Sequence, residues 1–450
     1  MRRHVLVGRL GPGDRINIPT AGDEVLSKLD LVASEKRLDH GIGRALDDLN
    51  ALGLFPTEVA VDLLILAAHV HAADTRISRA TESQDAWTRE IRLVVPVSDP
   101  VRWTTAAREL RRALDFLTGD RWSLGFRSRP TKFATIVRPT PKLPVAPPFN
   151  GVSLFSGGLD SLIGAIDVLQ GGGTPLLVSH AGEGAASTAQ EACFAGLKAH
   201  YKAAHFERLR VWMAFQKGLI KSVKSEDTTR GRSFLFFALG VFAGTGLPNP
   251  FTLRVPENGL IALNVPLDVL RLGSLSTRTT HPFYIARWHD VLDILGIAGR
   301  IENPYWNKTK GEMAAACADP ALLARLAPVS LSCSSPTKGR WQGRSVEHCG
   351  YCVPCLIRRA ALPPGDTTPY TVPDLSAAPL DSNSAKGAQV RSFQLAIARV
   401  KARPELARLL IHKPGPLAEA PERIDALAGV YRRGLEEVAR LLAGVTTQPL

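Results

Sequence analysis

One six-residue stretch, S-G-G-L-D-S, carries the groups that an anion-binding loop needs. It follows the apolar run V-S-L-F and precedes a helical pattern. Gly157 and Gly158 allow a tight turn close to a ligand, and the N–H groups that open the following helix favour negative charge. Ser156 and Ser161 add hydroxyl donors, whereas Asp160 suits a phosphate when Mg2+ bridges the two. A glycine turn with a helix cap is the alternative, but the residue order favours a phosphate site made by Ser156, Gly157, Gly158, Leu159, Asp160 and Ser161.

Four of the six cysteines form a second candidate site, with the spacing C-x15-C-x2-C-x2-C. Four thiolates satisfy tetrahedral Zn2+, and each two-residue spacing lets a tight turn point two sulfurs at one ion. Such a site has no open coordination position, so the metal would be structural. A redox pair or an iron–sulfur cluster is the alternative, because C-x2-C-x2-C also occurs in ferredoxins. We favour zinc, held by Cys333, Cys349, Cys352 and Cys355.

Strand and helix patterns alternate after the loop. V-S-L-F, T-P-L-L-V-S-H and R-L-R-V-W-M-A-F have the composition of strands, and each is followed by a helical pattern. This alternation predicts a parallel sheet covered by helices. We therefore expect an α/β fold with a doubly wound parallel sheet over residues 151–362, which includes the cysteine knuckle at 333–355.

Three other segments flank this unit. Residues 1–136 mix helix and strand patterns and predict an N-terminal α+β domain. Residues 137–150 hold five prolines in fourteen residues, which predicts a semi-rigid linker. Residues 363–450 predict a helical C-terminal extension. Its last helix has an apolar stripe typical of a packing face, formed by Ile424, Leu427, Tyr431, Val438 and Leu442.

Composition and charge restrict the kinds of protein that fit this sequence. The chain has 450 residues, of which 45% are hydrophobic and 22% charged, as in a globular protein of two or three domains. Its longest apolar stretches fall short of the ~18–20 residues of a membrane helix, and we recognise no targeting segment. We expect a cytoplasmic protein without a membrane partner. The net charge of +13 permits direct nucleic-acid binding, which we do not favour because the arginines are scattered along the chain.

The loop resembles the PP-loop of the N-type ATP pyrophosphatases. In that superfamily the loop holds the pyrophosphate of ATP while a substrate oxygen attacks the α-phosphorus, and the products are an adenylated substrate and pyrophosphate. The resemblance implies ATP and Mg2+ as cofactors. It also implies an adenine-nucleotide α-hydrolase-like sheet.

The order of the motifs resembles the 7-cyano-7-deazaguanine synthase family, QueC, over roughly residues 151–362. The family's knuckle also ends in C-x2-C-x2-C-x2-R, here with Arg358. G-R-S at 231–233 resembles its Gly-Arg-Asn turn, and Lys310 and Glu312 match its Pro-x5-Lys-x-Glu segment. The resemblance implies an ATP-dependent C–N ligase that adenylates a 7-deazaguanine carboxylate and passes it to an amine. A second round could dehydrate the amide to the nitrile preQ0.

Several features depart from that synthase. The spacer between Cys333 and Cys349 is longer, and an N-terminal domain and a helical tail are added. This layout resembles the QueC-like component of the Qat anti-phage defence systems, the QatC family, over nearly the whole chain. The resemblance implies antiviral defence and a partner protein from the same operon. We expect the N-terminal domain and the helices after Ser382, with their apolar stripe, to dock that partner and to bring one of its amines to the activated deazaguanine.

Two cations could act with the loop on phosphate charge. Lys310 and Arg232 could clamp the phosphates, and solvated surface cations are the alternative. We assign catalysis to Asp160, Ser161, Lys310 and Arg232.

Two polar segments could face the substrate. The first is P-E-N-G, for which a simple turn is the alternative, and the second is the run at 278–281, for which helix capping is the alternative. The predicted substrate-binding residues are Glu257, Asn258, Arg278, Thr279, Thr280 and His281.

Other functions fit part of the sequence. One is a plain 7-cyano-7-deazaguanine synthase, and another is a PP-loop enzyme that modifies tRNA, although no concentrated basic surface is evident. A non-catalytic scaffold is the third, and it would not need Asp160.

Overall fold

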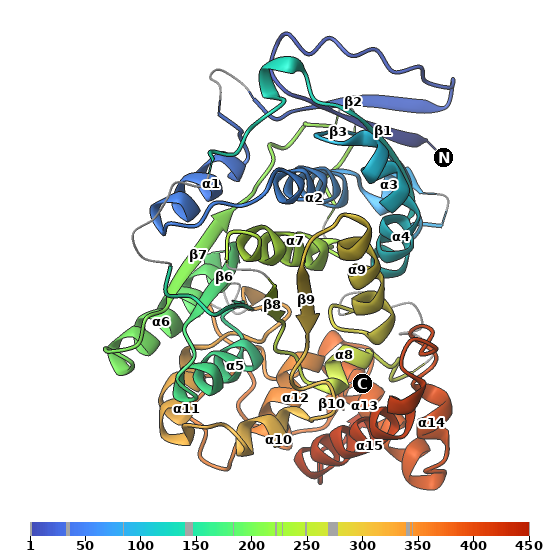
Figure 1. Cartoon of the computed structure of the whole chain (residues 1–450). Helices are drawn as coiled ribbons and strands as arrows, with labels where there is room; N and C mark the ends of the chain where they lie inside the picture. Colours follow the sequence, from blue (N-terminus) through green and yellow to red (C-terminus); the bar gives the residue numbers. More distant parts are fainter. Residues whose placement is uncertain are drawn as a thin grey trace.

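The computed structural model describes residues 2–32, 37–83, 85–139, 147–182, 184–220, 223–226, 228–247, 250–268, 278–338, 343 and 345–449. Two parallel sheets lie one above the other, with helices between them and more helices below the second sheet (Figure 1). The expected α/β class with parallel sheets is therefore confirmed. Within the proposed linker, residues 140–146 lie outside the described residues.

The N-terminal sheet has four strands in the order β2-β1-β3-β4, and every neighbouring pair is parallel. We expected an α+β unit here, but the observed strands are all parallel, and helix α4 connects β3 to β4. The elements are β1 (Arg3–Arg9), β2 (Glu24–Asp30), α1 (Ile42–Ala51), α2 (Glu58–Arg76), α3 (Arg79–Glu82), β3 (Glu90–Val97), α4 (Pro100–Thr118) and β4 (Arg121–Ser128).

The second sheet has five parallel strands in the order β7-β6-β5-β8-β9. The chain runs outward from β5 to β7 and then returns to the other side of β5, so the strand order reverses between β5 and β8. In parallel sheets ligands bind outside the carboxyl ends of the strands at such a point. The elements are β5 (Gly151–Leu154), α5 (Leu159–Gln170), β6 (Pro175–Ala181), α6 (Gly184–His200), β7 (Glu207–Trp212), α7 (Arg232–Gly244), β8 (Phe251–Arg254), α8 (Gly259–Leu263), α9 (Pro282–Ile294) and β9 (Gly299–Glu302).

Short helices and a helical tail follow the second sheet. Two strands of two residues each pair in parallel between the start and the end of the tail. The elements are α10 (Lys310–Ala315), α11 (Pro320–Leu326), α12 (Val353–Ala361), β10 (Leu380–Asp381), α13 (Ala385–Ala402), α14 (Leu406–Leu410), α15 (Ile424–Leu441) and β11 (Thr447–Gln448).

Helices α2 and α7 form the layer between the two sheets (Figure 1). Both are apolar almost all round, and a helix of this kind is stable only when it is buried on every side. Helix α2 contacts β1 and β3, whereas α7 contacts β5, β6 and β8. One apolar core therefore continues through both sheets, and the chain does not separate into independent cores at residues 137–150.

The apolar stripe of α15 is buried inside the molecule. Leu427, Tyr431, Val438 and Leu442 belong to a core that α15 shares with α8, α12, α13 and α14. The prediction of a packing face is confirmed. The expectation that this stripe docks a partner protein is wrong, because its own chain already covers the apolar surface.

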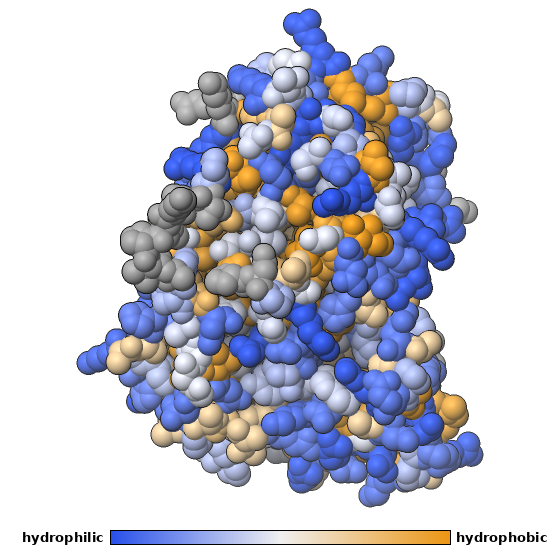
Figure 2. All heavy atoms as spheres, viewed as in Figure 1, coloured by the Kyte–Doolittle hydropathy of each residue, from blue (hydrophilic) through white to orange (hydrophobic). Residues whose placement is uncertain are grey.

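The outside of the molecule is mainly hydrophilic on the face shown in Figure 2, with apolar residues in scattered groups. Within the described part of the chain, no helix combines the length and the apolar character that a membrane crossing requires.

Candidate functional site

The predicted phosphate loop connects β5 to α5 at the point where the strand order reverses. Gly157 has a φ of 78°, the left-handed conformation that favours glycine. A Cβ on this residue would lie 2.8 Å from the backbone nitrogen of Gln190, so a side chain would not fit. Gly158 then gives the extended residue before α5. The two glycines therefore have the distinct conformational roles that a tight strand–helix turn requires.

The loop serines are bonded within the turn. The two hydroxyl oxygens of Ser156 and Ser161 lie 3.1 Å apart, and Ser161 donates to the Gly158 carbonyl at 3.0 Å. The Leu159 N–H donates to Ser332 Oγ at 3.3 Å, and the Leu331 N–H donates to the Gly157 carbonyl at 2.8 Å. The segment around Ser332 thus lies against the loop. Ser332 belongs to no motif and was not predicted from the sequence.

Two of the predicted site residues, Lys310 and Asn258, hold Asp160. Lys310 Nζ lies 2.7 Å from one carboxylate oxygen, and Asn258 donates to the other from its side chain at 2.7 Å and from its backbone at 3.1 Å. Lys310 and Asn258 are both buried. The proposed Mg2+ would have to share this carboxylate with a lysine. The charge of Lys310 also offers a second way to neutralise Asp160 beside a phosphate.

Glu257 lies next to this pair and has an unusual acidity. Burial raises the pKa of Glu257 to about 7, and the negative charge of Asp160 adds to the rise. Its carboxylate accepts hydrogen bonds from the backbone of Thr280 at 3.2 Å and from its hydroxyl at 2.6 Å. Asn303, which follows β9, donates to the Glu257 carbonyl at 2.7 Å and to the Thr280 hydroxyl at 3.1 Å. Asn303 was not predicted from the sequence.

Three of the predicted substrate residues have structural partners. His281 accepts a hydrogen bond from the Phe283 N–H and caps α9, which is the alternative we kept open. Arg278 donates to the Phe116 carbonyl of α4 at 2.9 Å and lies over the ring of that residue. The Thr279 and Ser233 hydroxyls lie 2.7 Å apart.

Arg232 opens α7, beside Ser233. Its guanidinium lies 5.4 Å from the ring centre of Phe236. Its charge also lowers the pKa of His180, at the end of β6, in addition to the larger effect of burial, and that pKa is about 3. The structure therefore places Arg232 near the carboxyl end of β6, on the side of the second sheet where the loop lies.

The four predicted metal ligands come together. Their sulfur atoms all lie within 4.8 Å of one another, and the cluster is largely buried. Cys352 donates its N–H to the sulfur of Cys349 at 3.3 Å, and Cys349 donates to that of Cys333 at 3.4 Å. This arrangement fits a tetrathiolate metal site. His348 is not part of it; its ring accepts a hydrogen bond from the Ser332 N–H at 3.1 Å.

Arg358 connects the knuckle with the phosphate loop. It is fully buried and donates to Ser330 Oγ at 2.8 Å and to Thr368 Oγ at 2.9 Å, and it also reaches the Ala327 carbonyl at 2.5 Å. These bonds fix the chain just before Ser332, which contacts the loop. The arginine that the family resemblance singled out therefore supports the segment between the two motifs.

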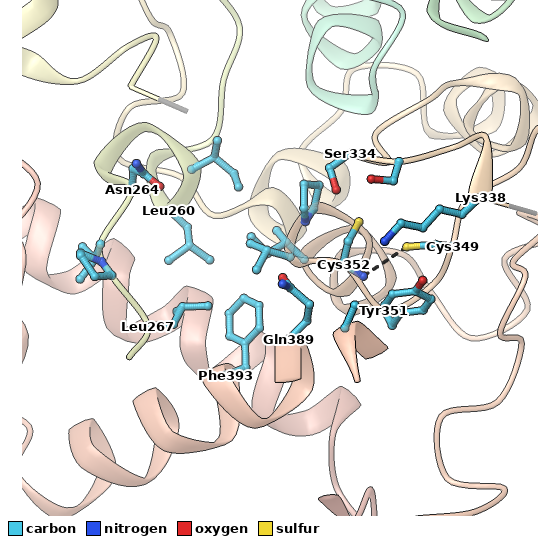
Figure 3. Close-up of a pocket in the computed structure, with 18 residues that line it drawn as sticks. Leu260, Asn264, Leu267, Ser334, Lys338, Cys349, Tyr351, Cys352, Gln389 and Phe393 are labelled. Atoms are coloured by element: carbon cyan, nitrogen blue, oxygen red, sulfur yellow. Dashed lines mark hydrogen bonds between the residues drawn. The ribbon is translucent and has the colours of Figure 1, made fainter. Parts of the chain in front are cut away.

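A cavity of about 430 Å³ lies between the knuckle, α8 and α13. Figure 3 shows Leu260 and Phe393 beside it, with Lys338, Tyr351 and Cys352 on the side of the knuckle. The described residues that line it include none of the predicted substrate-binding residues. The cavity is therefore next to the cysteine cluster and separate from the group around Asp160.

Comparisons with known proteins found no similar protein. No family model matches the chain, and no curated protein or solved structure does either.

Proposed function

We propose that this protein is an ATP-dependent ligase that forms AMP and pyrophosphate. The observation that carries the proposal is the loop Ser156–Ser161 at the switch point of a parallel sheet, with Lys310 and Asn258 converging on Asp160. Backbone N–H groups at the start of a helix favour a phosphate there. A buried lysine beside a loop carboxylate supplies the positive charge that departing pyrophosphate needs.

Each residue has a distinct role in this proposal. Lys310 neutralises Asp160 when no nucleotide is bound and turns toward phosphate charge when it is. Asp160 and the loop hydroxyls would hold Mg2+, which screens the charge of the phosphates when it is bound. Glu257, with a pKa of about 7, is partly ionised at neutral pH and takes the proton that an amine loses when it displaces AMP from the acyl adenylate.

The substrate class in the proposal comes from the resemblance to the QueC and QatC families. We propose a 7-deazaguanine carboxylate as the acyl donor and an amine of a partner protein from the same defence operon as the acceptor. The buried stripe of α15 gives no support to the partner. Zinc in the four-cysteine site would be structural, because four thiolates leave no position for a substrate.

The test is pyrophosphate release from ATP and Mg2+ with the carboxylate present. Asp160→Asn should reduce the rate by at least about a hundredfold, because it removes the charge that holds both the metal and Lys310. Asp293→Asn, an exposed change on α9, is the matched control and should keep the wild-type rate.

Intact-mass analysis of the partner then identifies the acceptor. A partner heavier by one deazaguanine acyl group supports the proposed transfer. Free nitrile with an unmodified partner would make the protein a plain synthase, and an undiminished rate in Asp160→Asn would remove the loop from catalysis.

A further inference from the structure

The short helix α10 begins at Lys310 and is fixed by a complete capping box. Thr309 Oγ1 accepts a hydrogen bond from the Glu312 N–H at 3.0 Å, and the Glu312 carboxylate accepts one from the Thr309 N–H at 2.8 Å. These two bonds satisfy N–H groups that would otherwise lack partners at the start of the helix. The box therefore sets the position of the backbone that carries Lys310.

Two residues one turn apart on α15 hold this capping box from outside. The buried carboxylate of Glu437 accepts from the Thr309 hydroxyl in a short hydrogen bond and from the Gly311 N–H at 3.3 Å. Arg433 binds the Glu312 carboxylate at 2.5 Å and donates to the Asn307 carbonyl at 2.9 Å. The C-terminal helix thus contacts both members of the box.

Glycines allow α15 to come this close. A Cβ on Gly311 would lie 2.5 Å from a Glu437 carboxylate oxygen, and one on Gly434 would lie 2.7 Å from the side chain of Leu260. Leu260 is in α8, which begins directly after Asn258. Helix α15 therefore packs against both segments whose residues hold Asp160.

We propose that Glu437, assisted by Arg433, is a positioning residue for Lys310, so that the C-terminal extension is part of the active site's support. The proposal rests on the proposed function, in which Lys310 acts on phosphate charge. A lysine side chain has four flexible carbons, so its ammonium group is placed only as well as its backbone is. A small displacement at the reacting atoms is enough to reduce the rate markedly.

The experiment compares Glu437→Gln with Glu436→Gln, which changes an exposed residue of the same helix. Glu437→Gln should lower kcat for pyrophosphate release about tenfold and change KM for ATP by less than about threefold, because positioning is lost and binding is kept. In a Lys310→Ala background, Glu437→Gln should cause no further loss, since the two residues act as one unit. Glu436→Gln should match the wild type throughout.

Hydrogen exchange provides a readout that does not depend on activity. The peptide covering 307–315 should exchange faster in Glu437→Gln than in Glu436→Gln, because the capping box loses its external support. Where Glu437→Gln fails to fold, Arg433→Ala, at a half-exposed residue, takes its place with the same expectations.

The outcomes separate the two proposals. A wild-type protein without pyrophosphate release would refute the proposed function, and the exchange rates alone would then decide whether Glu437 orders the start of α10. Unchanged exchange, unchanged kcat in folded Glu437→Gln, or an equal loss in the Lys310→Ala background would each overturn the positioning role.

Discussion

Two buried clusters of charged residues in this molecule neutralise their carboxylates in different ways. The first, in the N-terminal unit, consists of Asp74, Arg79, Arg89 and Asp120, with ion-pair distances of 2.6 to 3.2 Å. The second is the pair of Asp160 and Lys310 with Glu257 beside it. In the first, Asp74 and Asp120 each pair with both arginines, and Arg79 also lies 3.8 Å from Glu226, whereas in the second a single cation serves two carboxyl groups.

The acidities of the carboxyl groups show the difference. Burial opposes ionisation of Asp120, but the charges of Arg89 and Arg79 and the hydrogen bonds from Arg89 together outweigh it and keep the pKa of Asp120 below its ordinary value. Burial also opposes ionisation of Glu257, and the hydrogen bonds from Thr280 and the charge of Lys310 offset it only in part, so the pKa of Glu257 rises to about 7. A balanced cluster has a fixed charge and suits a structural role. An unbalanced one can exchange a proton near neutral pH, which suits chemistry.

The balanced cluster also has a connection to the second sheet. Asp74 accepts a hydrogen bond from the Gly231 N–H at 2.7 Å, just before α7 begins at Arg232. Arg79 donates to the Thr228 hydroxyl at 2.9 Å. The N-terminal unit therefore fixes the segment that leads to one predicted site residue, as the C-terminal helix does for Lys310.

The largest loss of stability is expected at the four-cysteine site, where a metal ion would neutralise the thiolates. Cys352→Ser should lose the bound metal and lower the free energy of unfolding by about 5 kcal/mol or more, because metal binding and folding are coupled at structural zinc sites. Elemental analysis should give one zinc per wild-type chain and none in the variant. Cys317→Ser changes a buried cysteine outside the cluster and should keep the metal. Iron, or well-folded protein without metal, would contradict the zinc assignment.

Breaking the balanced cluster should be the next largest change. Arg89→Ala leaves two buried carboxylates with one cation and should lower the free energy of unfolding by about 3–5 kcal/mol. Lys310→Ala should cost less, because the Asp160 side chain is 13% exposed whereas those of Asp74 and Asp120 are fully buried, and because Glu257 can stay protonated. Urea unfolding of both variants, with exposed Arg111→Ala as the control, measures the difference. Equal costs would mean that the two clusters do not differ in the way described.

The fold was largely accessible from the sequence. The strands β5 to β7 and the helices that follow them were predicted because their patterns depend on neighbours along the chain. Strands β1 and β2 were missed, and so was the continuous core across residues 137–150, since both depend on packing between distant segments. The stripe of α15 was recognised, but sequence alone does not say which surface covers it.

The candidate site was predicted in part. Motifs and their spacing indicated the loop, Lys310 and the four cysteines, and the polar segment P-E-N-G indicated Asn258. The structure brings Lys310 and Asn258 to Asp160 and the four cysteines to one another. Ser332, Asn303 and Glu437 escaped notice because each acts through a contact with a residue far away in the sequence. Single polar residues of this kind carry no spacing that would mark them.

The smallest effect gives the sharpest test, because it follows the proton of Glu257. Its folded-state pKa of about 7 lies above the usual 4.5, so the folded protein keeps this proton longer than the unfolded chain does. The contribution of Glu257 to the free energy of unfolding should therefore fall as pH rises from about 4.5 to about 7. Glu257→Gln should remove this fall and leave the variant more stable than the wild type at pH 8 by on the order of 1–3 kcal/mol, with little difference at pH 4.5.

Asp160→Asn then shows whether the two carboxyl groups share one cation. Without the Asp160 charge, the positive charge of Lys310 acts on Glu257 alone, so the pKa of Glu257 should fall. The loss of stability that Glu257 causes as pH rises should then shrink. Unfolding curves at several pH values for the wild type, Glu257→Gln, Asp160→Asn and the exposed control Glu436→Gln measure all of these changes. A fall of undiminished size in Asp160→Asn would mean that burial alone sets the acidity of Glu257. Asp160 and Glu257 would then ionise independently. Competition of the two carboxyl groups for Lys310 would no longer distinguish the second cluster from the first.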